Sequence, residues 1–110
     1  MRQFVIDEMS REEMDNLDSY MRNRLDRGLM DGMFWLNIPE DLEAESQHGH
    51  EDCRPFCCGF ELTRDKLIVE MLVRSRNNMH CTCIAYATPP QRAFVLEFLD
   101  KMLLEELIKA

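Results

Sequence analysis

The chain has 110 residues, of which 45% are apolar and 31% charged, and its 21 acidic and 13 basic side chains give a formal net charge of −8. The length suits one domain with a single core, and the composition argues against disorder and, through its negative charge, against a nucleic-acid partner. No apolar run approaches the roughly 20 residues that a membrane helix needs, and the N-terminus lacks a signal-peptide pattern, so we expect no membrane partner and a cytoplasmic location.

The first part of the chain predicts a strand, a helix and a second strand. A short β-prone run covers residues 3–7. Ser10 and Glu13 then predict a capping box at the start of a helix over 10–27, within which apolar residues recur on one helical face. A glycine directly after this helix predicts its end. An aromatic-rich strand over 33–38 ends at a proline.

The second part begins with a different kind of segment. Residues 39–56 contain six acids, one arginine and two prolines with little apolar periodicity, which predicts a long acidic loop. A meander of three strands over 57–63, 66–74 and 80–87 follows, with two-residue turns predicted at Arg64-Asp65 and Asn77-Asn78. Thr88 and Gln91 predict a second capping box, and a proline-initiated helix over 90–108 completes the chain.

Together these elements predict a single α+β domain over residues 1–110. Its antiparallel sheet has the element order β-α-β-loop-β-β-β-α, and both helices pack on one face of that sheet. Two-residue turns within the meander place Phe60 opposite Val69, and Val69 opposite Tyr86. This register gives the meander one apolar face and one mixed face.

The five cysteines and three histidines all lie in one stretch of the sequence. They are His48, His50, Cys53, Cys57, Cys58, His80, Cys81 and Cys83. An odd number of cysteines would leave one outside any closed disulfide framework, so we expect free thiols or metal ligands. The predicted register gathers these side chains at one end of the sheet, next to the acidic loop.

This grouping leads to the hypothesis of a zinc site, because thiolate and imidazole are the usual ligands of zinc. The candidate ligands are His48, His50, Cys53, Cys57, Cys81 and Cys83. Their spacing matches no specific zinc-finger pattern. Moreover, the register places Cys57 and Cys83 two strands, or about 9.6 Å, apart.

Simpler roles are open for the same residues. Cys58 faces the core in the predicted register, where it would act as a small buried hydrophobe. His48 and His50 would be solvated loop residues. A thiol redox protein that uses Cys81 and Cys83 is a further alternative. A catalytic pair of Cys81 with His80 is disfavoured, because adjacent strand residues point to opposite faces.

The last helix predicts a surface shared with another chain, since its apolar side chains cover more of its circumference than one core face requires. The candidate interface residues are Phe94, Phe98, Met102 and Leu103. With the acidic charge and no recognisable catalytic constellation, this favours a non-catalytic protein-interaction or regulatory domain, acting as a homodimer. Zinc binding and thiol redox chemistry are the alternatives, and zinc is the one cofactor considered.

Overall fold

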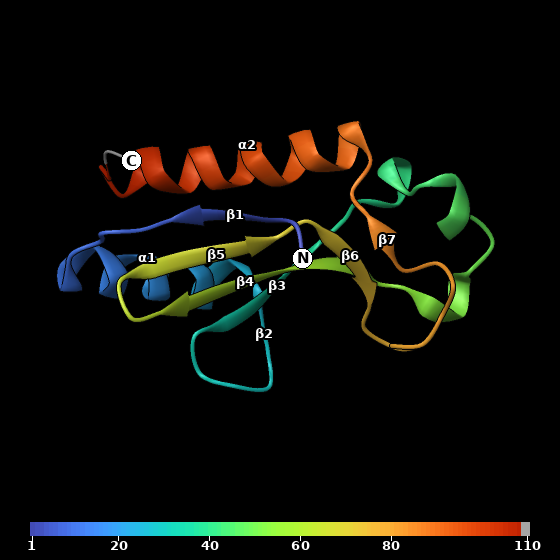
Figure 1. Cartoon of the computed structure of the whole chain (residues 1–110), viewed down its shortest axis with the longest axis horizontal. Helices are drawn as coiled ribbons and strands as arrows, with labels where there is room; N and C mark the ends of the chain where they lie inside the picture. The colour runs from blue at the N-terminus through green and yellow to red at the C-terminus, as the bar shows by residue number, and fades with distance from the viewer. Residues whose placement is uncertain (109–110) are drawn as a thin grey trace.

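An open, antiparallel sheet of seven strands and two helices form the α+β fold of residues 1–108, the part of the chain that this computed structural model describes (Figure 1). The strands are β1 (Gln3–Ile6), β2 (Asp26–Arg27), β3 (Met33–Asn37), β4 (Phe56–Thr63), β5 (Lys66–Glu70), β6 (Leu72–Ser75) and β7 (Ala85–Tyr86). The helices are α1 (Arg11–Arg24) and α2 (Pro89–Glu105). The sheet has the order β1-β5-β4-β3-β2, and β6 pairs with both β4 and β7. The predicted fold class is confirmed.

Both helices begin at the capping boxes that the sequence predicts. At the start of α1, the backbone N–H of Glu13 donates to the Ser10 hydroxyl at 3.1 Å, and the Ser10 N–H donates to the Glu13 carboxylate at 2.8 Å. At the start of α2, Gln91 and Thr88 exchange the same two bonds at 3.3 and 3.0 Å. These bonds satisfy backbone donors that have no partner within the helix.

The first helix ends earlier than predicted. It stops at Arg24 instead of continuing to residue 27, because the next residues form β2 and pair with β3. The backbone N–H of Gly28 donates to the carbonyl of Met33 at 2.7 Å. A Cβ atom at Gly28 would lie 2.8 Å from the Cβ of Met33. This glycine therefore permits the close approach of two strands and does not cap the helix.

The first hairpin of the meander has the predicted register, with Phe60 opposite Val69. The register changes where β5 gives way to β6, so that Cys57 lies opposite Arg74. Continuing the β4–β5 register would have placed Cys57 opposite Leu72. A displacement of two residues preserves the alternation of side chains, and Cys57 stays on the face opposite the core.

The last strand of the meander was predicted wrongly. Instead of a strand over 80–87, only β7 pairs, and Ala85 lies opposite Val73 where Thr82 was expected. Because three is an odd number of residues, this displacement reverses which side chains of the strand face the core. Tyr86 lies on the side of the sheet away from the core, not on the core side.

Polar contacts explain why the chain does not turn back directly after β6. The backbone N–H of Asn78 donates to the buried hydroxyl of Ser75 at 2.9 Å. The Asn77 amide donates to the carbonyl of Arg54. The asparagine pair thus attaches residues 76–84 to the acidic loop and does not form a two-residue hairpin turn.

Both helices pack against the core face of the sheet. The ring of Phe98 from α2 contacts Phe60 of β4 edge-to-face, with ring centroids 5.8 Å apart. It also contacts Tyr20 of α1 at 6.3 Å. The predicted packing of two helices on one face is therefore observed, with Phe98 at the point where α1, α2 and the sheet meet. No helix within residues 1–108 is long and apolar enough to cross a membrane.

The interface residues predicted on the last helix lie largely within the chain's own core. Met102 and Leu103 are buried, while Phe94 and Phe98 are half-buried and pack against the core cluster. The helix is apolar on several sides because it contacts both the sheet and α1. Within α2, the large apolar side chain that faces solvent is that of Leu104, which is 75% exposed.

Replacing Phe98 with alanine should lower the free energy of unfolding by about 3 kcal/mol, because the ring fills the junction between both helices and β4. Replacing Leu104 with alanine should change it by less than about 0.5 kcal/mol. Denaturant unfolding at two protein concentrations measures both values. Equal losses in the two variants would contradict the internal packing of Phe98.

Candidate metal centre

Two loops supply the side chains of the candidate metal centre. The acidic loop folds into three short 3-10 turns, η1 (Glu40–Leu42), η2 (Glu45–Gln47) and η3 (Glu51–Cys53). His50 precedes η3 and Cys53 ends it, so one turn of backbone brings both side chains to the same side. Cys81 and Cys83 come from the second loop, residues 76–84, between β6 and β7.

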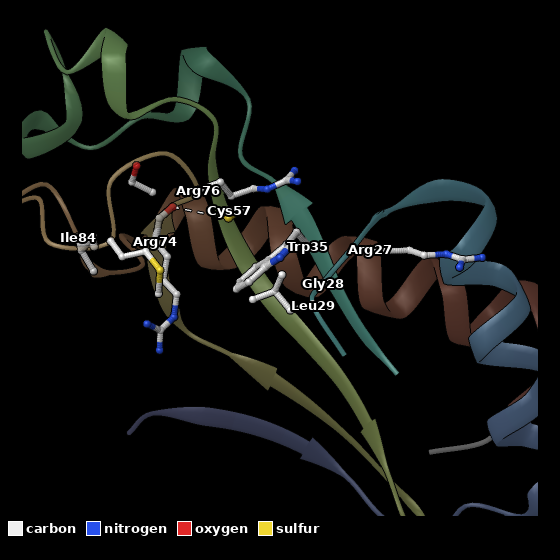
Figure 2. A pocket seen from close by; sticks show the side chains of 10 residues that line it. Arg27, Gly28, Leu29, Trp35, Cys57, Arg74, Arg76 and Ile84 are labelled. Atoms are coloured by element: carbon white, nitrogen blue, oxygen red, sulfur yellow. Dashed lines mark hydrogen bonds between the residues drawn. The ribbon is translucent and has the colours of Figure 1, made fainter. Parts of the chain in front are cut away.

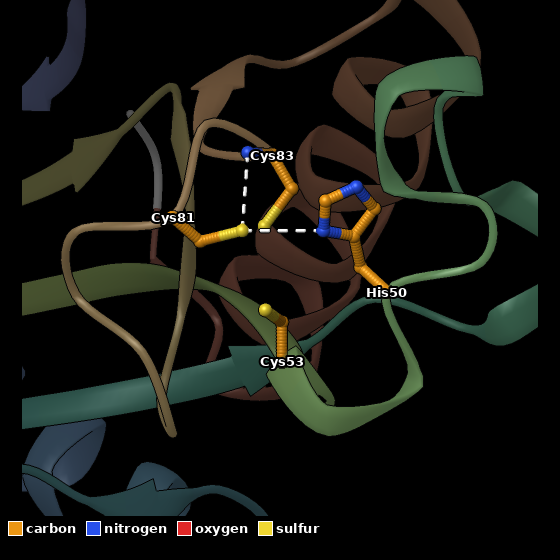
Figure 3. Close-up of side chains that lie close together, drawn as sticks. All are labelled: His50, Cys53, Cys81 and Cys83. Carbon is orange, nitrogen blue, oxygen red and sulfur yellow. Dashed lines mark hydrogen bonds between the residues drawn. The ribbon is translucent and has the colours of Figure 1, made fainter.

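The ligand-type atoms of His50, Cys53, Cys81 and Cys83 all lie within 4.8 Å of one another (Figure 3). Nδ1 of His50 is 3.2 Å from Sγ of Cys81, and the backbone N–H of Cys83 donates to the same sulfur at 3.4 Å. In tetrahedral zinc sites with Zn–S bonds of about 2.3 Å, neighbouring sulfurs lie about 3.8 Å apart. The separations of the four ligand atoms are therefore close to those that tetrahedral coordination of one zinc ion requires.

The cluster lies at the boundary between core and solvent. Cys53 and Cys83 are 5% and 0% exposed, whereas His50 and Cys81 are partly exposed. An ion would thus be shielded on the side of the buried thiols and reachable from the side of His50 and Cys81. This arrangement gives an entry path without an open cleft.

The three thiols differ in acidity because they hydrogen-bond with one another. Hydrogen bonds from the thiol and backbone N–H of Cys83 lower the pKa of Cys81 to about 6. Burial, followed by the hydrogen bonds with Cys81 and Cys53, raises the pKa of Cys83 to about 12. A hydrogen bond with Cys81, followed by burial, raises the pKa of Cys53. At neutral pH Cys81 is the thiolate of the group, and its neighbours stabilise its charge.

This donor set determines which ion the cluster could hold. Three thiols and one imidazole form the Cys₃His set of structural zinc sites, and thiolates select soft or borderline ions over magnesium or calcium. Four protein ligands would fill a tetrahedral coordination shell. The chain therefore carries a His/Cys₃ cluster that could hold a metal ion such as zinc.

Two of the six predicted ligands lie outside the cluster. The side chain of His48 is 63% exposed, and its Nδ1 is 4.0 Å from the carboxylate of Glu43. Cys57 is buried on the other side of the sheet, where its thiol donates to the carbonyl of Arg74 at 3.7 Å. Burial raises the pKa of Cys57 to about 12, and it does the same for Cys58, which lies in the core as expected.

The register from which the candidate ligands were predicted is wrong in the last strand of the meander. It placed Cys83 in a strand row with Cys57, whereas the loop between β6 and β7 directs Cys81 and Cys83 toward η3. His80 does not belong to the cluster either. The residues converge because both loops fold toward the same edge of the sheet.

Two buried glutamines support the cluster, and no role was predicted for Gln47. Gln47 and Gln91 are both 0% exposed, and the Gln91 amide donates to the Gln47 side-chain carbonyl at 2.9 Å. The Gln47 amide lies 3.5 Å from the carbonyl of Cys83, to which it donates. These bonds connect the acidic loop, the start of α2 and the backbone of a candidate ligand. Gln91 was predicted as a capping residue of the last helix, but nothing in the sequence around Gln47 distinguishes it from solvated loop residues.

A partly buried ion pair fixes the acidic loop next to the cluster. Arg54 donates two hydrogen bonds to Glu43, at 2.7 and 2.9 Å, and the Glu43 side chain is only 2% exposed. The hydrogen bonds from Arg54 lower the pKa of Glu43. Because Arg54 directly follows Cys53, this bidentate pair holds the end of η3 against the beginning of the loop.

Comparison with protein-family models, with curated proteins and with solved structures gave no significant match. The chemistry of the cluster therefore rests on its own geometry.

The ion pair predicts a pH-dependent contribution to stability. Since the folded pKa of Glu43 is lowered, its stabilising effect is present above its unfolded pKa of about 4.3 and is lost as the pH falls through its folded pKa. Glu43→Gln should lower the free energy of unfolding by about 1–3 kcal/mol at pH 7, and by progressively less below about pH 4. Urea unfolding from pH 3 to 7 measures this difference.

Glu45→Gln is the matched control, because Glu45 is exposed and lies in the same loop. It should change the free energy of unfolding by less than about 0.5 kcal/mol at every pH. A Glu43→Gln effect that stayed constant down to pH 3 would contradict the ionic origin of the stabilisation.

Proposed function

We propose that this chain is a zinc-binding protein in which one structural zinc ion is held by His50, Cys53, Cys81 and Cys83. The observation that supports this most directly is the convergence of one imidazole nitrogen and three sulfurs within 4.8 Å. Four protein ligands leave no position for a substrate or a reactive water, which favours a structural role over a catalytic one.

The proposed ion would stabilise the least regular part of the fold. The acidic loop contains only short 3-10 turns, and residues 76–84 form no strand. A zinc ion bound by two residues of each loop would cross-link them, and its binding free energy would add to the stability of the folded state. The function also implies a reducing compartment such as the cytosol, where thiols remain available as ligands.

Protein purified without metal-chelating resin should contain about one zinc ion per chain, measured by elemental analysis. The double variant His50→Ala, Cys53→Ser should lose this zinc and unfold at a lower temperature, because two of the four ligands are removed. His48→Ala and Cys57→Ala are the matched controls and should retain zinc. Folded wild-type protein free of metal, or equal loss in the controls, would refute the proposal.

Thiol redox chemistry is the second candidate, and the acidity of Cys81 favours it. A pKa of about 6 makes this partly exposed thiol a thiolate at neutral pH, which is the reactive form. Iodoacetamide should therefore alkylate Cys81 first in metal-free protein, as read by mass spectrometry. Protection of Cys81 by added zinc supports the zinc site, whereas rapid alkylation at any zinc concentration favours redox chemistry.

A non-catalytic interaction role, with self-association as a homodimer, also remains a proposal. The net charge of −8 and the exposed side chains of Leu104 and Leu107 support it. The buried positions of Met102 and Leu103 make them unsuitable as contact residues. Size-exclusion chromatography with light scattering tests the homodimer, and a monomer at high micromolar concentration would exclude it.

A further inference from the structure

The three sulfurs of the metal-ligand cluster differ in their access to solvent. Cys81 is partly exposed, whereas Cys53 and Cys83 are 5% and 0% exposed. All three sulfurs lie within 4.8 Å of one another, so the exposed sulfur has two buried sulfurs beside it (Figure 3). An accessible thiol next to a second thiol is typical of redox-sensing cysteines, because a small oxidant reaches the first and the second then forms a disulfide with it.

Cys53 is better placed than Cys83 to form this disulfide. Cys81 and Cys83 share a turn that the backbone N–H of Ile84 closes by donating to the Cys81 carbonyl at 3.2 Å, and the Gln47 amide donates to the Cys83 carbonyl. A disulfide inside this turn would have to fit a fixed backbone, and departures from ideal disulfide geometry are costly. Cys53 hydrogen-bonds with Cys81 from the other loop, and their disulfide would close a much longer loop, which constrains the unfolded chain more.

Cys57 provides a contrast within the same chain. It lines a pocket of about 290 Å³ on the face of the sheet that the helices do not cover, and its thiol donates to the carbonyl of Arg74 (Figure 2). Cys58 follows it in β4, but successive strand residues point to opposite faces. The hydrogen-bond partner of Cys57 is thus a backbone carbonyl and not a second thiol, so we expect no disulfide there.

The loop that carries Cys81 also borders the chain's only tryptophan. Met79 and Ile84 of this loop line the pocket together with Trp35. Residues 76–84 form no strand, so their position depends on contacts such as those in the cluster. A change of covalent state at Cys81 should therefore alter the surroundings of the indole, and Trp35 fluorescence reports on it.

We propose that a hydroperoxide oxidises Cys81, that Cys53 then forms a disulfide with it, and that this disulfide expels the zinc ion and takes over its cross-link between the two loops. The release of zinc rests on the proposed zinc site, whereas formation of the disulfide does not. A sulfur bound to zinc is held as the thiolate, which is the nucleophilic form, although coordination slows its attack by occupying one of its electron pairs.

The oxidation takes place in two steps. The sulfur of Cys81 attacks one oxygen of the hydroperoxide, so that an S–O bond forms and the O–O bond breaks, and the other oxygen takes up a proton and leaves as water or an alcohol. The sulfur of Cys53 then attacks the sulfur of the Cys81 sulfenic acid, the S–S bond forms, and the oxygen takes up a proton and leaves as water. The two cysteines together lose two electrons, which the hydroperoxide gains.

The disulfide removes two of the four zinc ligands. His50 and Cys83 remain, and two ligands do not complete the tetrahedral shell of a structural site. The disulfide joins the end of η3 to residues 76–84, the same two segments that the ion would join. The oxidised, zinc-free protein should therefore stay folded, with both loops still linked.

Hydrogen peroxide added to the zinc-loaded full chain should release about one zinc ion per chain, measured with a chromogenic chelator. The chain should become lighter by about 2 Da, and tandem mass spectrometry should locate the disulfide between Cys53 and Cys81. Dithiothreitol should restore zinc binding, and Trp35 fluorescence should change with the same time course as the disulfide. A disulfide between Cys81 and Cys83, or oxidation without any disulfide, would overturn the proposal.

Cys53→Ser and Cys83→Ser are matched variants, because each removes one buried thiol of the cluster. In metal-free protein treated with hydrogen peroxide, Cys83→Ser should still form the disulfide. Cys53→Ser should instead accumulate the Cys81 sulfenic acid, which dimedone traps. Equal loss of the disulfide in both variants would refute the role of Cys53, and circular dichroism checks that both are folded. If either variant does not fold, the location of the disulfide in the wild type decides alone.

Thermal unfolding tests whether the disulfide takes over the cross-link. The oxidised, zinc-free wild type should melt about 10 °C or more above the reduced, zinc-free protein, and Cys57→Ala should behave identically. An oxidised form that melts below the reduced form would contradict the cross-link. If zinc is bound and peroxide does not release it, the proposal is refuted while the zinc site stands. If no zinc is bound, the zinc site and the release both fail, and the location of the disulfide in the metal-free chain decides the rest.

Discussion

The convergence of two irregular loops at one edge of the sheet is the constraint on which the rest of the structure depends. Sγ of Cys81 lies 3.2 Å from Nδ1 of His50, although the two residues are 31 positions apart in sequence. The contact holds without a ladder of backbone hydrogen bonds, since it depends on side-chain bonds from Ser75, Gln47 and Arg54 to neighbouring backbone and carboxylate oxygens. Such a network is stable only when its buried polar atoms are satisfied, and among the described residues every buried side-chain nitrogen and oxygen has a partner.

The regular elements were predictable because local chemistry specifies them. Capping boxes at Ser10 and Thr88 determine where the helices begin, and the hairpin register follows from the alternation around Phe60. The strand over 80–87 was predicted wrongly because Asn77-Asn78 is equally compatible with a hairpin turn and with side-chain bonds to a distant loop. Tertiary contacts decide between these conformations, and they do not appear in a local pattern. The clustering of cysteine and histidine in sequence did indicate the site, but the separation of His50 from His48, and of Cys53 from Cys57, required coordinates.

The loop between β6 and β7 contributes residues to both faces of the molecule. One side of it contributes thiols to a cluster with the composition of a structural zinc site, and the other contributes Ile84 to an apolar pocket that contains the chain's one tryptophan. No strand pairing holds this loop, so its position depends on the hydrogen bonds of Asn77 and Asn78 and on the contact of Cys81 with His50.

The coordination shell of the bound ion tests the central claim most directly. X-ray absorption at the zinc edge of the purified protein should show four scatterers, three sulfurs at about 2.3 Å and one nitrogen at about 2.0–2.1 Å. A shell dominated by oxygen or nitrogen, or one with more than four ligands, would contradict the assignment of His50, Cys53, Cys81 and Cys83 as the zinc ligands.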